Sequence, residues 1–373
     1  MKDQLTDFDL PALSRHDLQT PSCLAESYRI AVVEWRPEKD GLPQVIHDEL
    51  GQLGHQPCYF KPGSAIPIDI DVVFTFGPYG KFLPIAHELG CRPVEKRPVL
   101  IHWNMEGLPD PRIPWPLIRG LGACRSWIGR LYDTNNRIIQ AVGIKLTAPW
   151  ESRVLRFRYV GDYYHAHGRG WLDVFADSSA IYARMHNQHG LPTVVAPWGA
   201  TPRWYADLGL ERDIDILWVG QRGSTRRGKL LERIRQELQG HDVKMHVADN
   251  EENPFIYGEE RTRFFNRAKI TLNLTRTWYD DNFSRFAMAA PNRSLIISEP
   301  LLPHCPQYVA GTHYVSAPID QLAQTILYYL EHEAERQQLA ENAYQLVTTE
   351  LTLRNSMKAV MDAICLKRNN AKL

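Results

Sequence analysis

Polar and charged side chains gather between two apolar runs in the C-terminal half of the chain. Ile270–Leu274 is typical of a buried strand, and a polar loop follows it before an apolar helix begins. The expected loop ligands are Asn273, Arg276, Asp280, Asn282, Phe283, Ser284 and Arg285. In open α/β sheets, ligands bind beyond the carboxyl ends of the strands, and anions favour helix N-termini. This density of polar groups between buried elements indicates an anion site, with Arg285 as the first candidate for a phosphate contact, although exposed turn residues would explain part of it.

A second basic cluster lies in the glycine-flanked turn Gly220–Gly228, GQRGSTRRG, between the predicted strand Asp213–Val219 and a predicted helix. Glycines let a backbone approach a phosphate, and Arg222, Arg226 and Arg227 add positive charge. The turn does not match GxxxxGK[ST], which argues against a P-loop ATPase. The alternative is a solvated loop with surface arginines.

The N-terminal half supplies candidates for the acceptor side of a reaction. His102, Trp103 and Glu106 lie at or just after the end of the predicted strand Pro98–Trp103, where they would face the expected ligand cleft. A His or Glu there could act as general base toward a hydroxyl. A buried Glu106 would have a raised pKa, whereas His102 is equally consistent with a hydrogen-bonded core histidine. Further acceptor-side candidates are Asp162, Tyr163 and His165, in a segment that an exposed loop explains equally well.

Strands and helices alternate in the way that predicts two α/β units with parallel sheets. The expected strands lie at residues 29–35, 70–76, 98–103, 171–176, 192–196, 213–219 and 243–247, with two more inside 257–302. We expect a loose arm at 1–25, an acceptor-side domain at 26–205 and a second domain at 206–350 that carries the anion site and would bind a donor substrate. A helix with a tail follows at 351–373 and packs back on the first domain.

Composition narrows the classes of function. A chain of 373 residues exceeds what a single core usually supports. Lys+Arg and Asp+Glu are both 43, and this zero net charge argues against a chain-wide nucleic-acid or membrane footprint. Six scattered cysteines without a CxxC pair argue against a zinc site or a disulfide framework. The N-terminal residues lack the apolar segment of a secretory signal, and no apolar run approaches a membrane span, so we expect a cytoplasmic protein.

Several segments of residues 170 to 362 resemble the spore-maturation (CgeB-like) relatives of the group-1 glycosyltransferases. They include FADSSAIYARM, DILWVGQRG, FNRAKITLNL and NFSRFAMAAPNRSLIISE, and upstream VLIHWNMEGLPDP matches in outline. The resemblance implies the GT-B architecture, in which two Rossmann-like domains face a cleft. It further implies transfer of a sugar from a nucleotide-diphosphate sugar, with a UDP-sugar as the first expectation, to a glycan or small-molecule acceptor, without a metal or other cofactor.

The chain departs from the group-1 pattern at the ribose. That pattern has a loop carboxylate followed eight residues later by a helix glutamate, and the matching positions here are Asp280 and Met288. A methionine cannot accept a hydroxyl hydrogen bond in the same way, so Glu299 becomes the candidate ribose contact. Arg293 stands where the pattern has a helix glycine. The basic residues that neutralise the diphosphate correspond to Arg222 and to Arg226 or Arg227.

Two other functions remain open. The missing helix glutamate is compatible with a non-catalytic nucleotide- or sugar-binding protein on the same scaffold. A sugar-nucleotide epimerase shares the architecture, but it would need several acidic and histidine residues in the cleft, and the second domain offers few. An inverting transferase would need a base, Glu106 or His102, whereas a retaining one would not.

Overall fold

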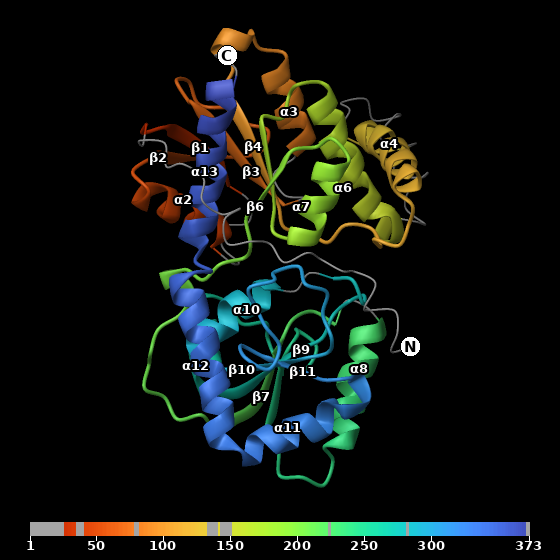
Figure 1. The fold of residues 1–373 in the computed structure, drawn as a ribbon, viewed down its shortest axis with the longest axis vertical. Helices are drawn as coiled ribbons and strands as arrows, with labels where there is room; N and C mark the ends of the chain where they lie inside the picture. The colour runs from red at the N-terminus through yellow and green to blue at the C-terminus, as the bar shows by residue number, and fades with distance from the viewer. Residues whose placement is uncertain are drawn as a thin grey trace.

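The computed structural model describes residues 26–34, 41–77, 82–132, 141, 151–222, 225–280 and 283–370. The chain forms two lobes, one above the other in Figure 1. The described strands make a parallel sheet of six, in the order β2-β1-β3-β4-β5-β6, and a parallel sheet of five, in the order β11-β10-β9-β7-β8. The expected α/β class with two Rossmann-like sheets is confirmed, while the arm expected at 1–25 lies outside the described residues.

The N-terminal lobe contains the first sheet and the helices around it. Its strands are β1 (Arg29–Val33), β2 (Gln56–Phe60), β3 (Val72–Phe76), β4 (Val99–Asn104), β5 (Val174–Asp177) and β6 (Thr193–Val195). Its helices are α2 (Leu42–Gln52), α3 (Phe82–Gly90), α4 (Trp115–Tyr132), α6 (Glu151–Gly168) and α7 (Ala180–Gln188), with short 3₁₀ turns at Val94–Lys96 and Pro202–Trp204.

The C-terminal lobe contains the second sheet. Its strands are β7 (Ile214–Val219), β8 (Met245–Ala248), β9 (Ala268–Asn273), β10 (Leu295–Ser298) and β11 (Val315–Ser316). Its helices are α8 (Thr225–Glu237), α9 (Gly258–Arg267), α10 (Phe283–Ala289), α11 (Leu322–Glu331) and α12 (Glu333–Thr349), with 3₁₀ turns at Ala290–Asn292 and Ile319–Gln321.

Central strands in both sheets are mostly apolar because helices cover both faces. Every residue of β3 and of β7 is buried. Parallel sheets of this kind lack the alternation of polar and apolar residues that a one-sided sheet shows. The sequence therefore predicts the central strands well. It does not predict β2, an edge strand in which only Phe60 is buried, or the two-residue β11.

The last helix, α13 (Leu353–Asn370), returns to the N-terminal lobe, where Figure 1 shows it beside α2. Leu353, Met357, Val360 and Ile364 belong to the apolar core of that lobe, as expected for the final helix. The two chain segments that connect the lobes also touch. The amide of Ala200 donates to the carbonyl of Leu351 (2.9 Å), and the amide of Leu353 donates to the carbonyl of Ala200 (2.8 Å).

The segment that carries the acceptor-side candidates Asp162, Tyr163 and His165 is helical and forms α6. It packs along α4 at a crossing where both helices present glycine. A Cβ atom on Gly161 would lie 1.9 Å from the carbonyl oxygen of Gly122, so the two backbones approach too closely for any side chain. This contact fixes α6, whose first half points toward the C-terminal lobe.

We expect Gly161→Ala to destabilise the protein by about 1–3 kcal/mol, because the added methyl group must push the two helices apart. Gly120→Ala is the matched control, since a Cβ at this exposed position of α4 meets nothing within 4 Å. Alanine should be neutral or stabilising there because it favours the helix. Thermal unfolding of both variants checks this, and an equal effect of the two substitutions would contradict the crossing.

Candidate functional site at the junction of the lobes

The loop after β9 carries Asp280, which joins the two lobes. Its carboxylate is 1% exposed and accepts a hydrogen bond at 2.5 Å from Arg156 of α6 in the N-terminal lobe. It also accepts from the backbone amide (3.0 Å) and the Nε (3.1 Å) of Arg276. Burial opposes ionisation of Asp280, but Arg276 and Arg156 outweigh it and lower its pKa. A Cβ on Gly107 would lie 3.2 Å from both partners, so the glycine leaves room for the Arg156–Asp280 pair.

Arg285 crosses the carboxyl end of β7. Its Nε donates to the carbonyl oxygen of Val219 (3.1 Å), and its Nη1 donates to Asn273, the last residue of β9. Gly220 leaves room for this path, since a Cβ there would lie 2.8 Å from Nη2 of Arg285. Within the described part of the chain no carboxylate forms an ion pair with Arg285. Its partners are neutral oxygens.

Two further guanidinium groups lie close to Arg285. Burial, followed by the charges of Arg227 and Arg276, lowers the pKa of Arg285 to about 9. Burial, followed by Arg276, lowers the pKa of Arg227 to about 10. Arg227 lies in the first turn of α8 and donates to the backbone carbonyls of Gln221 and Arg222. Arg227 and Arg276 thus lie close enough to Arg285 for their charges to disfavour its protonated form, and closely spaced cations of this kind attract anions.

Arg226 and Glu299 form an ion pair beside this cluster, and the glutamate is its buried member. Nη1 of Arg226 donates to Glu299 (2.9 Å) and to the carbonyl oxygen of Thr275 (2.8 Å), and Nη2 reaches the other carboxylate oxygen. Glu299, which is 3% exposed, also accepts from the amide (2.7 Å) and hydroxyl (2.9 Å) of Thr275. The pair therefore ties the end of β10 to the loop after β9.

Glu106 reaches the same junction from the N-terminal lobe. One of its carboxylate oxygens lies 3.7 Å from Nη2 of Arg276. Asn104, the last residue of β4, donates to the backbone carbonyl of Glu106 (3.1 Å) and to Asp177 (2.8 Å). Asn104 in turn accepts from the hydroxyl of Tyr163 (2.9 Å). These buried contacts hold the short turn that presents Glu106 to the donor-side loop.

Residues 226–362 match a family model described as glycosyl transferase-like. A search of curated proteins found no match. Sucrose-phosphate synthase from Thermosynechococcus elongatus aligns with a TM-score of 0.54 and 11% identity, over 92% of this chain and 98% of that one. Anabaena HepE, in complex with UDP and glucose, aligns with a TM-score of 0.51 and 9% identity, over 93% of this chain and 100% of that one. A glycosyltransferase from Rickettsia africae aligns with a TM-score of 0.51 and 10% identity, over the same shares.

The protein has the GT-B fold of glycosyltransferases. Its two sheets correspond to the two lobes of that fold, and the matched family segment runs from the start of α8 into α13. The family match and the fold together support sugar transfer as the class of activity.

In this GT-B chain, two predicted acceptor-side residues lie in the core. His102 is 0% exposed, its Nδ1 is 2.9 Å from the hydroxyl of Thr75, and burial lowers its pKa to about 3. Trp103 is also 0% exposed and donates from Nε1 to the carbonyl of Ala196 (2.9 Å). The expectation that they face a ligand is wrong, because both faces of β4 are covered.

The acceptor-side residues predicted on α6 are also placed differently. Tyr163 is 2% exposed, and its hydroxyl donates a hydrogen bond to Asn104. Burial raises the pKa of Tyr163 well above the ordinary value. Asp162, 8% exposed, lies 3.4 Å from Arg158 on the same helix. His165 lines a pocket between α3, α4 and α6, away from the junction. Because α6 is a helix, these three side chains point in different directions and have different surroundings.

Arg222 faces away from the arginine cluster. Its Nε donates to Asp249 (2.6 Å), it lies 3.4 Å from Glu251, and it also pairs with Glu252. The hydrogen bond that Arg222 donates to Asp249 is the main cause of its raised pKa. The geometry does not support the expected phosphate contact of Arg222. The helix expected from residue 229 begins at Thr225, so Arg226 and Arg227 are helical and turn toward the sheet.

The remaining predicted donor residues differ in burial. Ser284 is partly buried in the first turn of α10, and Asn282 lies outside the described residues. Phe283 is 3% exposed and stacks on Tyr308 at 5.2 Å, so it is a core residue. Met288 packs between the cores of the two lobes. Arg293 adopts φ 54°, the backbone region for which the family pattern uses glycine, and pairs with Glu341 at 2.7 Å.

Sequence reasoning missed Arg156 and His304. Arg156 lies in α6, and none of its neighbours in the sequence indicates that it reaches Asp280. His304, 0% exposed, bonds to Ser179 at Nδ1 (2.7 Å) and to the carbonyl of Tyr279 at Nε2 (3.1 Å), and so links α7 to the donor-side loop. Both residues contact groups more than 100 positions away, which only the folded chain shows.

The described residues contain neither a metal-binding cluster nor a membrane-spanning helix. No group of three or more His, Cys, Asp or Glu side chains is placed to hold a metal ion. None of the described helices is long and apolar enough to cross a membrane.

Asp280→Asn should lower the free energy of unfolding by about 1.5–3 kcal/mol at pH 7, because it removes charge-assisted bonds from a buried position. The folded-state pKa of Asp280 is lowered, so its stabilisation is complete above the unfolded pKa of about 4 and is lost as pH falls through the folded value. The gap in melting temperature between parent and variant should thus be constant from pH 7 to about pH 5 and narrow below pH 4.

Asp48→Asn provides the control, because Asp48 pairs with Arg203 at the surface and should contribute at most about 1 kcal/mol. A gap for Asp280→Asn that is absent, or that is as large at pH 3 as at pH 7, would contradict the charge-based account of this contact.

Proposed function

We propose that the protein transfers a sugar from a nucleoside-diphosphate sugar, with a UDP-sugar as the first choice, to an acceptor hydroxyl, and that it does so without a metal ion. The arginine cluster of Arg227, Arg276 and Arg285 carries the proposal. These cations lie at the carboxyl ends of β7 and β9, where parallel α/β sheets bind ligands. The complexes of HepE with UDP and with UDP-glucose support the choice of nucleotide.

The cluster suits the leaving group of such a reaction. In the reaction the bond between the sugar carbon and the phosphate oxygen breaks, and the acceptor oxygen takes its place on that carbon. Negative charge grows on the departing diphosphate, and fixed guanidinium groups stabilise that charge without reorganising. Arg285 is the best placed of the three because its own partners are neutral oxygens.

Glu106 is the group that can accept the acceptor's proton. It lies on the opposite lobe from the cluster, 3.7 Å from Arg276, while His102 is buried in the core. In an inverting reaction the hydroxyl proton passes to the carboxylate of Glu106. In a retaining front-face reaction it passes to the departing phosphate, and Glu106 then has no proton to take.

Glu299 acts in this scheme through Arg226. Its carboxylate is buried and bonded to Arg226 and Thr275, so the geometry favours a positioning role over the expected direct ribose contact. The position of Met288 likewise supports packing in place of ribose binding. Glu299 and Met288 therefore favour a second candidate function, a nucleotide-binding protein without turnover. We also propose that the chain belongs to the CgeB-like subfamily.

Arg285→Gln should weaken UDP binding by about 10- to 100-fold, the equivalent of one lost charge-assisted hydrogen bond. Arg267→Gln is the matched control, since Arg267 pairs with Asp213 at the opposite end of the sheet. Titration calorimetry with UDP measures both. Equal affinities for the parent and the Arg285 variant would remove Arg285 from the donor site.

Glu106→Gln should lower kcat about 10²- to 10⁴-fold with UDP affinity unchanged, as expected when a general base is lost. Asp110→Asn serves as control because Asp110, a few residues along the same loop, is paired with Arg112. Transfer and donor hydrolysis are measured against a panel of UDP-, GDP- and TDP-sugars. An unchanged kcat would exclude Glu106 as the base and favour the retaining route. Nucleotide binding without turnover on any donor would overturn the transferase proposal in favour of the binding protein.

A further inference from the structure

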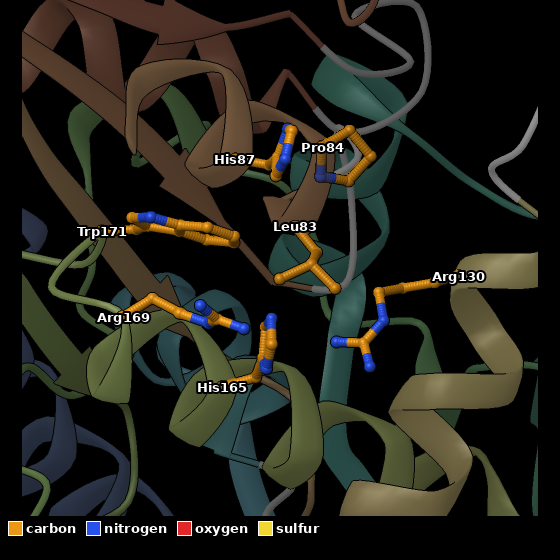
Figure 2. A pocket seen from close by; sticks show the side chains of 7 residues that line it. All are labelled: Leu83, Pro84, His87, Arg130, His165, Arg169 and Trp171. Atoms are coloured by element: carbon orange, nitrogen blue, oxygen red, sulfur yellow. The ribbon is translucent and has the colours of Figure 1, made fainter. Parts of the chain in front are cut away.

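A second pocket lies in the N-terminal lobe between α3, α4 and α6, with a volume of about 450 Å³ (Figure 2). This is within the size range of small-molecule sites. His165 contributes to it, nine residues beyond Arg156 on α6, which is about 13 Å along the helix axis and half a turn around it. Arg156 faces Asp280, so the pocket and the junction are separate places on the protein.

The floor of the pocket is the indole ring of Trp171, which the backbone holds rigidly. A Cβ on Gly90 would lie 2.1 Å from Cδ1 of this ring, so the indole packs directly on the bare backbone of Gly90. Gly170, with φ 68°, turns the chain after α6, and the amide of Trp171 donates to the carbonyl of Ala166 (2.9 Å). The ring is therefore presented in one orientation.

Two histidine rings stand nearly perpendicular to the indole. His87 makes an angle of 87° with Trp171 at a centroid distance of 5.1 Å, and His165 an angle of 81° at 5.5 Å. Burial, followed by the charges of Arg130, Arg169 and His87, lowers the pKa of His165. A neutral imidazole can both donate and accept a hydrogen bond, which suits the hydroxyl groups of a sugar.

Two guanidinium groups complete the pocket. Figure 2 shows Arg130 of α4 and Arg169, just after α6, pointing toward His165 from opposite sides. No carboxylate of the described chain lines the pocket or forms an ion pair with either arginine. Cations near helix C-termini are favourable in themselves. That effect explains single basic residues at these helix ends, but it does not explain their convergence on a fixed aromatic floor.

We propose that this pocket binds a sugar that carries an anionic group, a carboxylate or a phosphate, at a site separate from the donor junction. The indole offers a flat apolar surface to the carbon face of the sugar ring. Arg130 and Arg169 pair with the anion, because guanidinium matches carboxylate and phosphate in geometry and charge. His87 and His165 hydrogen-bond the hydroxyl groups. This site does not depend on the reaction proposed for the junction.

The test is titration calorimetry with four probes: glucuronate, glucose 6-phosphate, glucose and inorganic phosphate, each with UDP absent and at saturation. At least one of the two anionic sugars should bind at least 10-fold more tightly than glucose and inorganic phosphate, and UDP should leave its affinity unchanged. Which of the two binds identifies the anion. Arg130→Gln and Arg169→Gln should each weaken binding about 10-fold, since each removes a charge-assisted contact.

Arg92→Gln is the matched control, a half-buried arginine just beyond α3 that pairs with Glu88 and does not line the pocket. Because Arg130 and Arg169 lie outside the core, their variants should have the same melting temperature as the parent protein. The proposal fails if neither anionic sugar binds, if glucose or inorganic phosphate binds equally well, if UDP displaces the sugar, or if both arginine variants keep the parental affinity.

Discussion

The buried carboxylate of Asp280 connects the parts of the protein on which function depends. A carboxylate at this depth is costly unless it is paired, and Arg156 and Arg276 supply the pairs from the two lobes. The same contact fixes the loop after β9 and brings the first half of α6 against it. The donor-side loop is therefore ordered by the acceptor-side lobe, so neither lobe alone contains the complete site.

Among the described residues around that contact, positive charge exceeds what the carboxylates balance. Asp280 is committed to Arg156 and Arg276, and Glu299 to Arg226 and Thr275. Arg285 is left with neutral oxygens, at a pKa lowered to about 9. A bound diphosphate would stabilise the protonated form of Arg285, whereas a neutral ligand would not. The charges at the junction therefore support the anionic donor proposed above.

Most of the fold follows from sequence, and the junction only partly. Fully buried strands such as β3 and β7 are mostly apolar, interrupted by Thr75 and Asp215, and the order of elements around β9 and β10 is as predicted. The edge strand β2 is short and has only one buried residue, so it escapes detection. The density of polar residues in one loop singles out Arg285, Asn273 and Asp280, and the structure places these three at the junction. Arg156 and Asn104 are not singled out in this way, because their roles rest on partners 124 and 73 positions away.

The most direct test of this account compares uridine, UMP and UDP as ligands of the intact protein by titration calorimetry. If the arginine cluster binds the diphosphate, affinity should rise at each added phosphate, with UDP at least 10-fold tighter than UMP, and it should fall with increasing salt. Equal binding of uridine and UDP, or affinities that salt does not change, would contradict the account.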